Sequence, residues 1–531
     1  MKTELTFHGA AGCVTGFCAR LKTATATVLI DCGLFQGPKT LKALNYQPFP
    51  FEPGEVDAVL LTHAHIDHSG QLPKLTKAGF VGPIYATPGT VALCEIMLAD
   101  CAHIQESEVE HLNRRNERRG VPPVEPIYTV RDAARAMRQF QTIELEEWTE
   151  VAPGVRARWW NAGHILGSAS IEVEVEEKDG PMRLLFSGDL GPGGRDFLKD
   201  PEAPSNIDHL IVESTYGGTE RPVCSPDERR RALANELRLA HDAGGPLLMP
   251  AFAVERTQEL LADLLQIVDQ GEVPPVEIFL DSPLAIKACE IFLSHGWSGG
   301  RNPFERVRAA GRLHYLEKPW DSDQLEKLRG WHIIMAGSGM CDAGRVRKHL
   351  KRLLWRREAT VLLSGFQAAG TLGRLLQEGR KTVRIQGEAY RVAARVRSLD
   401  LYSGHADGPA LVRWVGARAP IAGNIFLAHG EPAALTALRS RLTATGLDGA
   451  NIAIPALDDA FSLKRQASEP AASTARLSPA APTALDWHNS RSEFLTALDE
   501  RLDRMSDAAR AELLGRLSGM LAAKDAKQAA R

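Results

Sequence analysis

Residues 62–70 read Thr-His-Ala-His-Ile-Asp-His-Ser-Gly and follow an apolar run at 59–61. This motif places His63, His65, Asp67 and His68 close together in the chain. Imidazole and carboxylate groups are ligands for borderline divalent ions such as zinc, and a catalytic site leaves one coordination position open. The alternating histidines mark a strand end, while the adjacent Asp67 and His68 can diverge toward a second ion. The pattern predicts a metal site; the simpler alternative is a polar surface loop.

The cysteines and the apolar runs indicate a cytoplasmic protein. None of the eight cysteines lies in a C-x-x-C pair, which argues against a structural zinc site. Their scattered, mostly apolar contexts suggest buried, reduced thiols. The N-terminus enters a strand-like alternation without a signal peptide, and no apolar run is long enough to cross a bilayer. We therefore expect no contact with a membrane.

The chain length and charge limit the possible architectures and partners. A length of 531 residues predicts roughly two to four domains, or one core with a large insertion. A hydrophobic content of 44% and a charged content of 24% are typical of globular proteins. The net charge of -3 gives no chain-wide signature of nucleic-acid binding, so any site for a polyanion must be local.

The pattern of apolar runs and turn residues divides the chain into segments. Residues 1–208 read as short β-runs separated by Gly, Pro and Asp, with few helical stretches of any length. Residues 209–395 alternate strands and helices, which predicts a second α/β domain with a parallel sheet. A strand at 425–428 ends in His429, so we expect the second domain to interrupt the first, which residues 396–462 complete.

The C-terminal part differs in composition. Residues 463–484 are rich in Ala, Ser and Pro, which predicts a linker. Residues 485–531 contain two amphipathic patterns and are expected to form a helical tail. Two short helices are not stable alone. We expect this tail to dock on its own chain, on a partner, or on the second subunit of a homodimer; a poorly ordered end is the alternative.

Three more residues have the surroundings of metal ligands. His164 lies in a Gly-flanked loop between two β-runs, Asp189 ends a strand in Phe-Ser-Gly-Asp, and His429 ends another strand. Each of them alone would more often have a structural role. Together with the first motif they supply six monodentate ligands and one bridging carboxylate, which is enough for two ions.

These motifs resemble those of the metallo-β-lactamase superfamily, and specifically its β-CASP nuclease branch, over about residues 1–460. Asp31 in Asp-Cys-Gly-Leu-Phe-Gln-Gly matches the first acidic motif of the family, and residues 63–68 match the second. His164 matches the third motif and Asp189 the fourth. The resemblance implies an α/β protein, namely an αββα sandwich with an inserted parallel α/β cap, the β-CASP domain.

The inserted domain has motifs of its own. Glu213 in Glu-Ser-Thr-Tyr-Gly matches motif A, His405 in Ser-Gly-His-Ala-Asp matches motif B, and His429 matches motif C. RNA-processing members are similar to this chain in having His at motif C, whereas DNA-repair members typically have Val. The resemblance therefore favours RNA over DNA.

The family arrangement implies two zinc ions, with Mn²⁺ as the alternative metal. The first ion is expected on three imidazoles, those of His63, His65 and His164. The second is expected on Asp67, His68 and His429, with Asp189 as the bridging carboxylate. Ions ~3.5–4 Å apart share a water whose pKa falls toward ~7, and the resulting hydroxide attacks phosphorus in line.

Three residues are the candidate catalytic groups: Asp67, His405 and Glu213. His405 is expected to contact the scissile phosphate and to protonate the leaving oxygen, and Glu213 to orient it. Alternatively, Glu213 only caps a strand end. Ser338 and Gly339 form a turn before a basic helix expected at 343–356, and such turns bind phosphate. The basic face of that helix is a candidate lining for an RNA groove, and a solvated surface is the alternative.

We expect a metal-dependent ribonuclease that hydrolyses phosphodiester bonds of single-stranded RNA in RNA processing or decay. The alternatives are a small-molecule ester or thioester hydrolase of the same fold, a DNA nuclease, and a catalytically silent scaffold. Endonuclease and 5′-exonuclease cleavage are both left open, because both occur on this scaffold with the same ligands.

Overall fold

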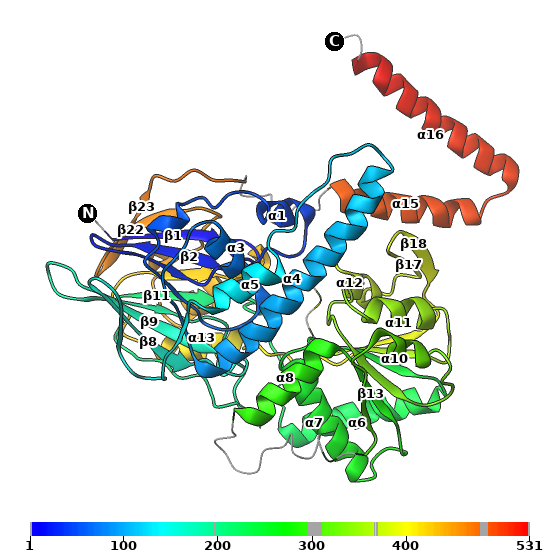
Figure 1. The fold of residues 1–531 in the computed structure, drawn as a ribbon, viewed down its shortest axis with the longest axis horizontal. Coiled ribbons are helices and arrows are strands. Elements are labelled where there is room, and N and C mark those ends of the chain that lie inside the picture. Colours follow the sequence, from blue (N-terminus) through cyan, green and yellow to red (C-terminus); the bar gives the residue numbers. More distant parts are fainter. Residues whose placement is uncertain are drawn as a thin grey trace.

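Two mixed β-sheets packed face to face form the part of the molecule that contains the ligand motif (Figure 1). The structure is a computed structural model that describes residues 3–195, 198–222, 224–295, 309, 311–365, 367, 370–477 and 487–528. The first sheet has the order β23-β22-β1-β2-β3-β4-β5-β6, and the second has the order β21-β20-β11-β10-β9-β8-β7.

The strands of the first sheet are β1 (Glu4–Gly9), β2 (Cys18–Lys22), β3 (Thr27–Ile30), β4 (Ala58–Leu60), β5 (Ile84–Ala86), β6 (Phe140–Thr142), β22 (Ala460–Lys464) and β23 (Ala467–Ala471). Those of the second are β7 (Thr149–Ala152), β8 (Val155–Asn161), β9 (Ala169–Val175), β10 (Met182–Phe186), β11 (His209–Glu213), β20 (Ile425–Ala428) and β21 (Ile452–Ala453). In β9, Ile171 and Val173 face the core between the sheets, while Glu172 and Glu174 pair with arginines of β8. This alternation is the pattern of a strand with one buried face.

Helices cover the outer faces of both sheets. They are α1 (Lys39–Leu44), α2 (Ile66–Ser69), α3 (Leu72–Lys77), α4 (Pro88–Glu117) and α5 (Val130–Met137) along the first sheet, and α13 (Gly408–Gly416) and α14 (Pro432–Ala444) on the second. The predicted αββα sandwich is confirmed. The prediction of few helical stretches before residue 209 is wrong, because α4 is a 30-residue helix.

The cap is built on a parallel six-stranded sheet, as predicted. Its order is β14 (Leu313–Tyr315), β13 (Ile278–Asp281), β15 (Ile333–Ala336), β12 (Leu247–Pro250), β16 (Thr360–Leu363) and β19 (Arg395–Ser398). Its helices are α6 (Pro226–Asp242), α7 (Arg256–Asp269), α8 (Pro283–Ser294), α10 (Pro319–Gln324), α11 (Val346–Leu353) and α12 (Leu372–Gln377), and β17 (Thr382–Ile385) pairs with β18 (Glu388–Arg391). Figure 1 places this domain beside the sandwich, with α4 running past both.

The structure moves three of the predicted segment boundaries. Strand β11, assigned from the sequence to the cap, pairs with β10 and β20 in the second sheet of the sandwich. The cap sheet extends beyond residue 395, because β19 ends at Ser398. Residues 463–471 are not a linker, since β22 and β23 form a hairpin that pairs with β1. Residues 478–484 of the predicted linker lie outside the described residues.

The predicted C-terminal helices are α15 (Trp487–Asp503) and α16 (Asp507–Gln528). Helix α15 lies beside the β17–β18 hairpin, where Arg384 pairs with Asp499, and α16 projects away from the body of the molecule (Figure 1). None of the helices in the described part of the chain is long and apolar enough to cross a lipid bilayer.

Candidate metal centre

The ligand-type side chains stand where strands of the sandwich end. His63 and His65 follow β4, and α2, which starts at Ile66, carries Asp67 and His68. The other three come from separate segments: His164 from the loop between β8 and β9, Asp189 after β10, and His429 directly after β20. His429 has a φ of 51°, a conformation that is uncommon for non-glycine residues and that clusters at active sites.

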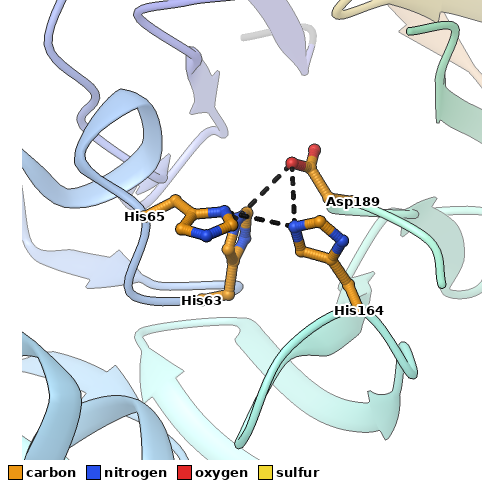
Figure 2. Close-up of side chains that lie close together, drawn as sticks. All are labelled: His63, His65, His164 and Asp189. Atoms are coloured by element: carbon orange, nitrogen blue, oxygen red, sulfur yellow. Dashed lines mark hydrogen bonds and ion pairs between the residues drawn. The ribbon is translucent and has the colours of Figure 1, made fainter. Parts of the chain in front are cut away.

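One group of ligand atoms surrounds His65 (Figure 2). Its Nδ1 lies 3.2 Å from Nε2 of His63 and 3.1 Å from Nε2 of His164. Oδ2 of Asp189 lies 3.5 Å from Nε2 of His63 and 3.6 Å from Nε2 of His164. Three imidazoles and one carboxylate oxygen therefore face a common point.

A second group lies on the other side of Asp189. Nε2 of His68 is 3.1 Å from Nε2 of His429, which in turn is 3.5 Å from Oδ2 of Asp67. Oδ1 of Asp189 is 3.3 Å from Nε2 of His68. The two oxygens of one carboxylate thus face the two groups, which is the position of a bridging ligand.

The pKa shifts of His63, His65 and Asp189 suit a divalent cation. Burial lowers the pKa of His63 to about 3 and that of His65 to about 4, so both imidazoles are neutral and have a free lone pair at neutral pH. Burial alone would raise the pKa of Asp189, but the nearby histidines His429 and His68 outweigh it and hold that pKa well below its usual range. His68 differs, because burial would lower its pKa but Asp189 and Asp31 outweigh burial and raise that pKa well above its usual range.

Asp189 gives the most direct test of the fit. Its Oδ1 is buried and has no hydrogen-bond partner among the residues that the structure describes. A buried carboxylate oxygen without a hydrogen bond costs free energy, which a cation at that point would recover. The residues present therefore fit bound divalent metal.

Each ligand histidine except His65 uses its other ring nitrogen to bind the protein. Nδ1 of His68 lies 2.7 Å from Oδ2 of Asp31, and Nδ1 of His164 donates to the carbonyl of Gly404 at 2.7 Å. Nδ1 of His63 lies 3.0 Å from the hydroxyl of Thr62, and that of His429 lies 3.0 Å from the hydroxyl of Thr215. Such contacts fix the ring orientation and tautomer of a metal ligand. Of these partners, only Asp31 was singled out from the sequence.

His405 and Glu213 meet at the edge of the cluster. Nδ1 of His405 lies 3.2 Å from Oε1 of Glu213 and 3.9 Å from Oδ2 of Asp189. Burial lowers the pKa of His405, but the carboxylate of Glu213 outweighs burial, so the net pKa is raised. Oε1 of Glu213 also accepts from the amide of Leu190 at 2.7 Å. Glu213 therefore contacts both the segment after β10 and His405, and its role in orienting His405 stays a prediction.

Ser338 and Gly339 are not part of this cluster. The amide of Ser338 donates to the carbonyl of Ala343, and its hydroxyl accepts from the amide of Ala343. The carbonyl of Gly339 accepts from Nε2 of Gln367. The following helix is shorter than predicted, since α11 spans Val346–Leu353. A phosphate-binding role for this turn stays a prediction.

Comparison with known proteins agrees with this geometry. The chain matches the profile of the metallo-beta-lactamase superfamily over residues 11–241 and that of the Beta-Casp domain over residues 257–376. A ribonuclease of Thermus thermophilus is 35% identical over 448 residues, which are 82% of this chain and 95% of that protein. The chain belongs to the β-CASP family of the metallo-β-lactamase superfamily.

Other β-CASP relatives differ in length. A transcription termination factor of Methanothermobacter thermautotrophicus is 29% identical over 436 residues, 78% of this chain but only 65% of that factor. An RNase J-like protein of Methanocaldococcus jannaschii is 29% identical over 441 residues, 80% of this chain and 92% of that protein. Residues 389–455 also match the profile of the Zn-dependent metallo-hydrolase RNA specificity domain. This last match covers His405 and His429.

Proposed function

We propose that this β-CASP protein is a metal-dependent ribonuclease that hydrolyses phosphodiester bonds of single-stranded RNA. The single observation that supports this most is the position of Asp189, whose two oxygens face two separate groups of ligand atoms. The relatives named as ribonucleases and the match to the RNA specificity profile support RNA as the substrate. The reaction belongs to RNA processing or decay.

The donor set is suited to two zinc ions, with Mn²⁺ as the alternative. His63, His65 and His164 would hold one ion, Asp67, His68 and His429 the other, and Asp189 both. When bound, such a pair supplies a hydroxide nucleophile at neutral pH and neutralises charge on the phosphate. Metal content measured by elemental analysis after purification without added metal would identify the ions.

His405 serves as the proton donor in this reaction. Its Nδ1 is engaged with Glu213, so Nε2 presents the proton that the leaving oxygen takes. Its raised pKa favours the imidazolium form that this role requires. Glu213 orients the ring, and the backbone at Ser338 and Gly339 contacts substrate phosphate from the cap.

The test compares four samples on three substrates. Wild-type protein and the His65→Ala, His405→Ala and His241→Ala variants are incubated with labelled single-stranded RNA, DNA of the same sequence and a small ester. We expect cleavage of RNA alone, lost in His65→Ala and strongly reduced in His405→Ala. His241 is a partly exposed histidine on α6 and provides the matched control. Cleavage that persists in His65→Ala, or ester hydrolysis without RNA cleavage, would contradict the proposal.

Mapping the product ends on RNA with a blocked 5′ end separates the two cleavage modes. An endonuclease cuts the blocked RNA internally, whereas a 5′-exonuclease requires the free end.

We also propose a cytoplasmic homodimer in which the C-terminal tail docks on the second subunit. The eight free cysteines support the compartment, and the exposed Leu514 and Met520 on α16 support the docking. Sedimentation of the full chain, compared with a Met520→Glu variant, tests the dimer.

A further inference from the structure

The chain crosses from the cap back to the sandwich in contact with the candidate metal ligand His164 and with Glu213. Strand β19 of the cap ends at Ser398, and α13 of the sandwich begins at Gly408. Between them, the four consecutive residues 402–405, here called the return segment, each bind a different part of the molecule. The contacts of this segment join the cap to a metal ligand.

The first contact is with the cap. The hydroxyl of Tyr402 donates to Oδ2 of Asp263 on α7 at 2.7 Å, and the Tyr402 side chain is fully buried. Asp263 also accepts from Nε of Arg229 on α6 at 2.8 Å. The carboxylate that holds Tyr402 is thus fixed by a second cap helix.

The second contact is with the loop that follows the bridging aspartate. Arg195 donates to the carbonyl of Ser403 and also pairs with Glu259 on α7. Glu259 keeps a second partner, because Nη1 of Arg229 lies 2.8 Å from its Oε1. One guanidinium therefore joins the sandwich, the return segment and the cap.

The last two contacts reach the metal centre. The carbonyl of Gly404 accepts from Nδ1 of His164 at 2.7 Å, and Nδ1 of His405 lies 3.2 Å from Glu213. A Cβ at position 404 would lie 3.1 Å from Cε1 of His164, which is closer than most such contacts, so a side chain there would press on this ring. A displacement of the return segment would therefore change the orientation of a metal ligand and of the proton donor together.

We propose that Tyr402 and Arg195 are positioning residues, which transmit the position of the cap to His164 and His405 through the return segment. Contacts that orient a metal ligand influence both affinity and rate, typically by about 10–100-fold. The kinetic readout of this inference rests on the proposed ribonuclease activity. The spectroscopic readout requires only that the protein binds Co²⁺ at this site, and not that it cleaves RNA.

The decisive variant is Tyr402→Phe, which removes one hydroxyl and leaves Asp263 bound to Arg229. We expect kcat for RNA to fall by about tenfold, as for other partners of metal ligands, with KM changed less than twofold. We also expect the visible spectrum of the Co²⁺-substituted protein to shift, because the ring of His164 is held less firmly. Tyr128→Phe is the matched control, since Tyr128 is equally buried in the sandwich and lies outside the metal cluster.

Arg195→Gln provides a second, independent variant, since Glu259 retains Arg229. We expect the same direction of change, and the double variant should lose less than the product of the two single effects because both act through one segment. An unchanged Co²⁺ spectrum and an unchanged kcat per folded molecule in both variants would overturn the proposal. If the wild-type protein does not cleave RNA, the proposed function fails, while the Co²⁺ spectra still decide whether the return segment orients His164.

Discussion

The sandwich and the cap both place polar side chains at strand ends, but they satisfy them differently. In the sandwich, the candidate ligand histidines turn one nitrogen toward each other, and Oδ1 of Asp189 has no hydrogen bond to any described residue. In the cap, Asp281 at the end of β13 is fully buried and accepts from Ser322, Arg345 and His349, each at 2.6 Å. The first arrangement is complete only with a cation, whereas the second is already complete.

The same location in a sheet thus has two different uses. An unsatisfied buried carboxylate destabilises the protein alone and stabilises the complex with metal. A satisfied one stabilises the fold and gains little from a ligand. We infer that the sandwich edge is the reaction site and that this part of the cap edge supports the domain.

Replacing the bridging carboxylate should have the largest effect. Asp189→Asn removes the charge that both ligand groups share, so we expect the metal content to fall and RNA cleavage to drop by at least about 10³-fold. Several kcal/mol of metal-dependent stabilisation are lost, and each ~1.4 kcal/mol is tenfold in rate. Metal analysis and initial rates measure this. If Asp189→Asn kept full activity and full metal content, Asp189 would not differ in function from Asp281 in the cap.

Replacing the residues that contact the candidate ligand histidines should lower the affinity for metal less than Asp189→Asn does, but by a measurable amount. Asp31→Asn weakens the contact that orients His68, and we expect the affinity for metal to fall by about 10–100-fold. Thr215→Val removes the neutral hydroxyl beside His429, so its effect should be smaller than that of Asp31→Asn. Competition with a chromophoric chelator gives both affinities. If Thr215→Val lowered the affinity for metal more than Asp31→Asn did, the charge of the partner would not be what holds these histidine rings in place.

The candidate metal ligands could be identified from the sequence because their signal is local. His63 and His65 lie in one short motif after an apolar run, Asp189 follows β10 after two residues, and His429 follows β20 directly. Apart from Asp31, their partners were not predictable, since Thr215 and Gly404 are common residue types that reach the site only through the tertiary fold. The same holds for the return segment, whose contacts join residues more than a hundred positions apart.

The errors in the fold have physical causes as well. Helix α4 was missed because its N-terminal half packs against both the sandwich and α8 of the cap, which hides the one-sided pattern of a surface helix. Its start was nevertheless encoded, since Thr87 caps the amide of Thr90 and Pro88 follows at the first helical position. Strand β11 and the β22–β23 hairpin were misassigned because strand pairing is a long-range property.

In the cap, the corresponding substitution should affect stability and leave the chemistry intact. Asp281→Asn replaces charged hydrogen bonds with neutral ones, so we expect the free energy of unfolding to fall by about 2 kcal/mol. Metal content and kcat per folded molecule should stay at the wild-type level. Thermal unfolding combined with titration of active sites separates the two quantities. A loss of metal in this variant would mean that the cap edge belongs to the metal centre.

The smallest effect is expected on the exposed face of the same domain. The basic helix α11 was a candidate RNA groove, but Arg345 is bound to Asp281 and to the carbonyls of Leu316 and Glu317, and Lys348 pairs with Asp323. Cations that already have partners gain less from a phosphate, and an exposed pair is worth about 0.2–1 kcal/mol.

Lys348→Ala should therefore change KM for RNA by less than about fivefold, since ~1.4 kcal/mol corresponds to tenfold in affinity. The slope of log KM against log salt concentration should also stay constant, because each phosphate contact that is lost would flatten it by about 0.7 for a single strand. Lys327→Ala, a neighbouring exposed lysine on the segment after α10, is the matched control. A flatter salt dependence in Lys348→Ala alone would place RNA on this helix and extend the substrate site from the sandwich edge across the cap.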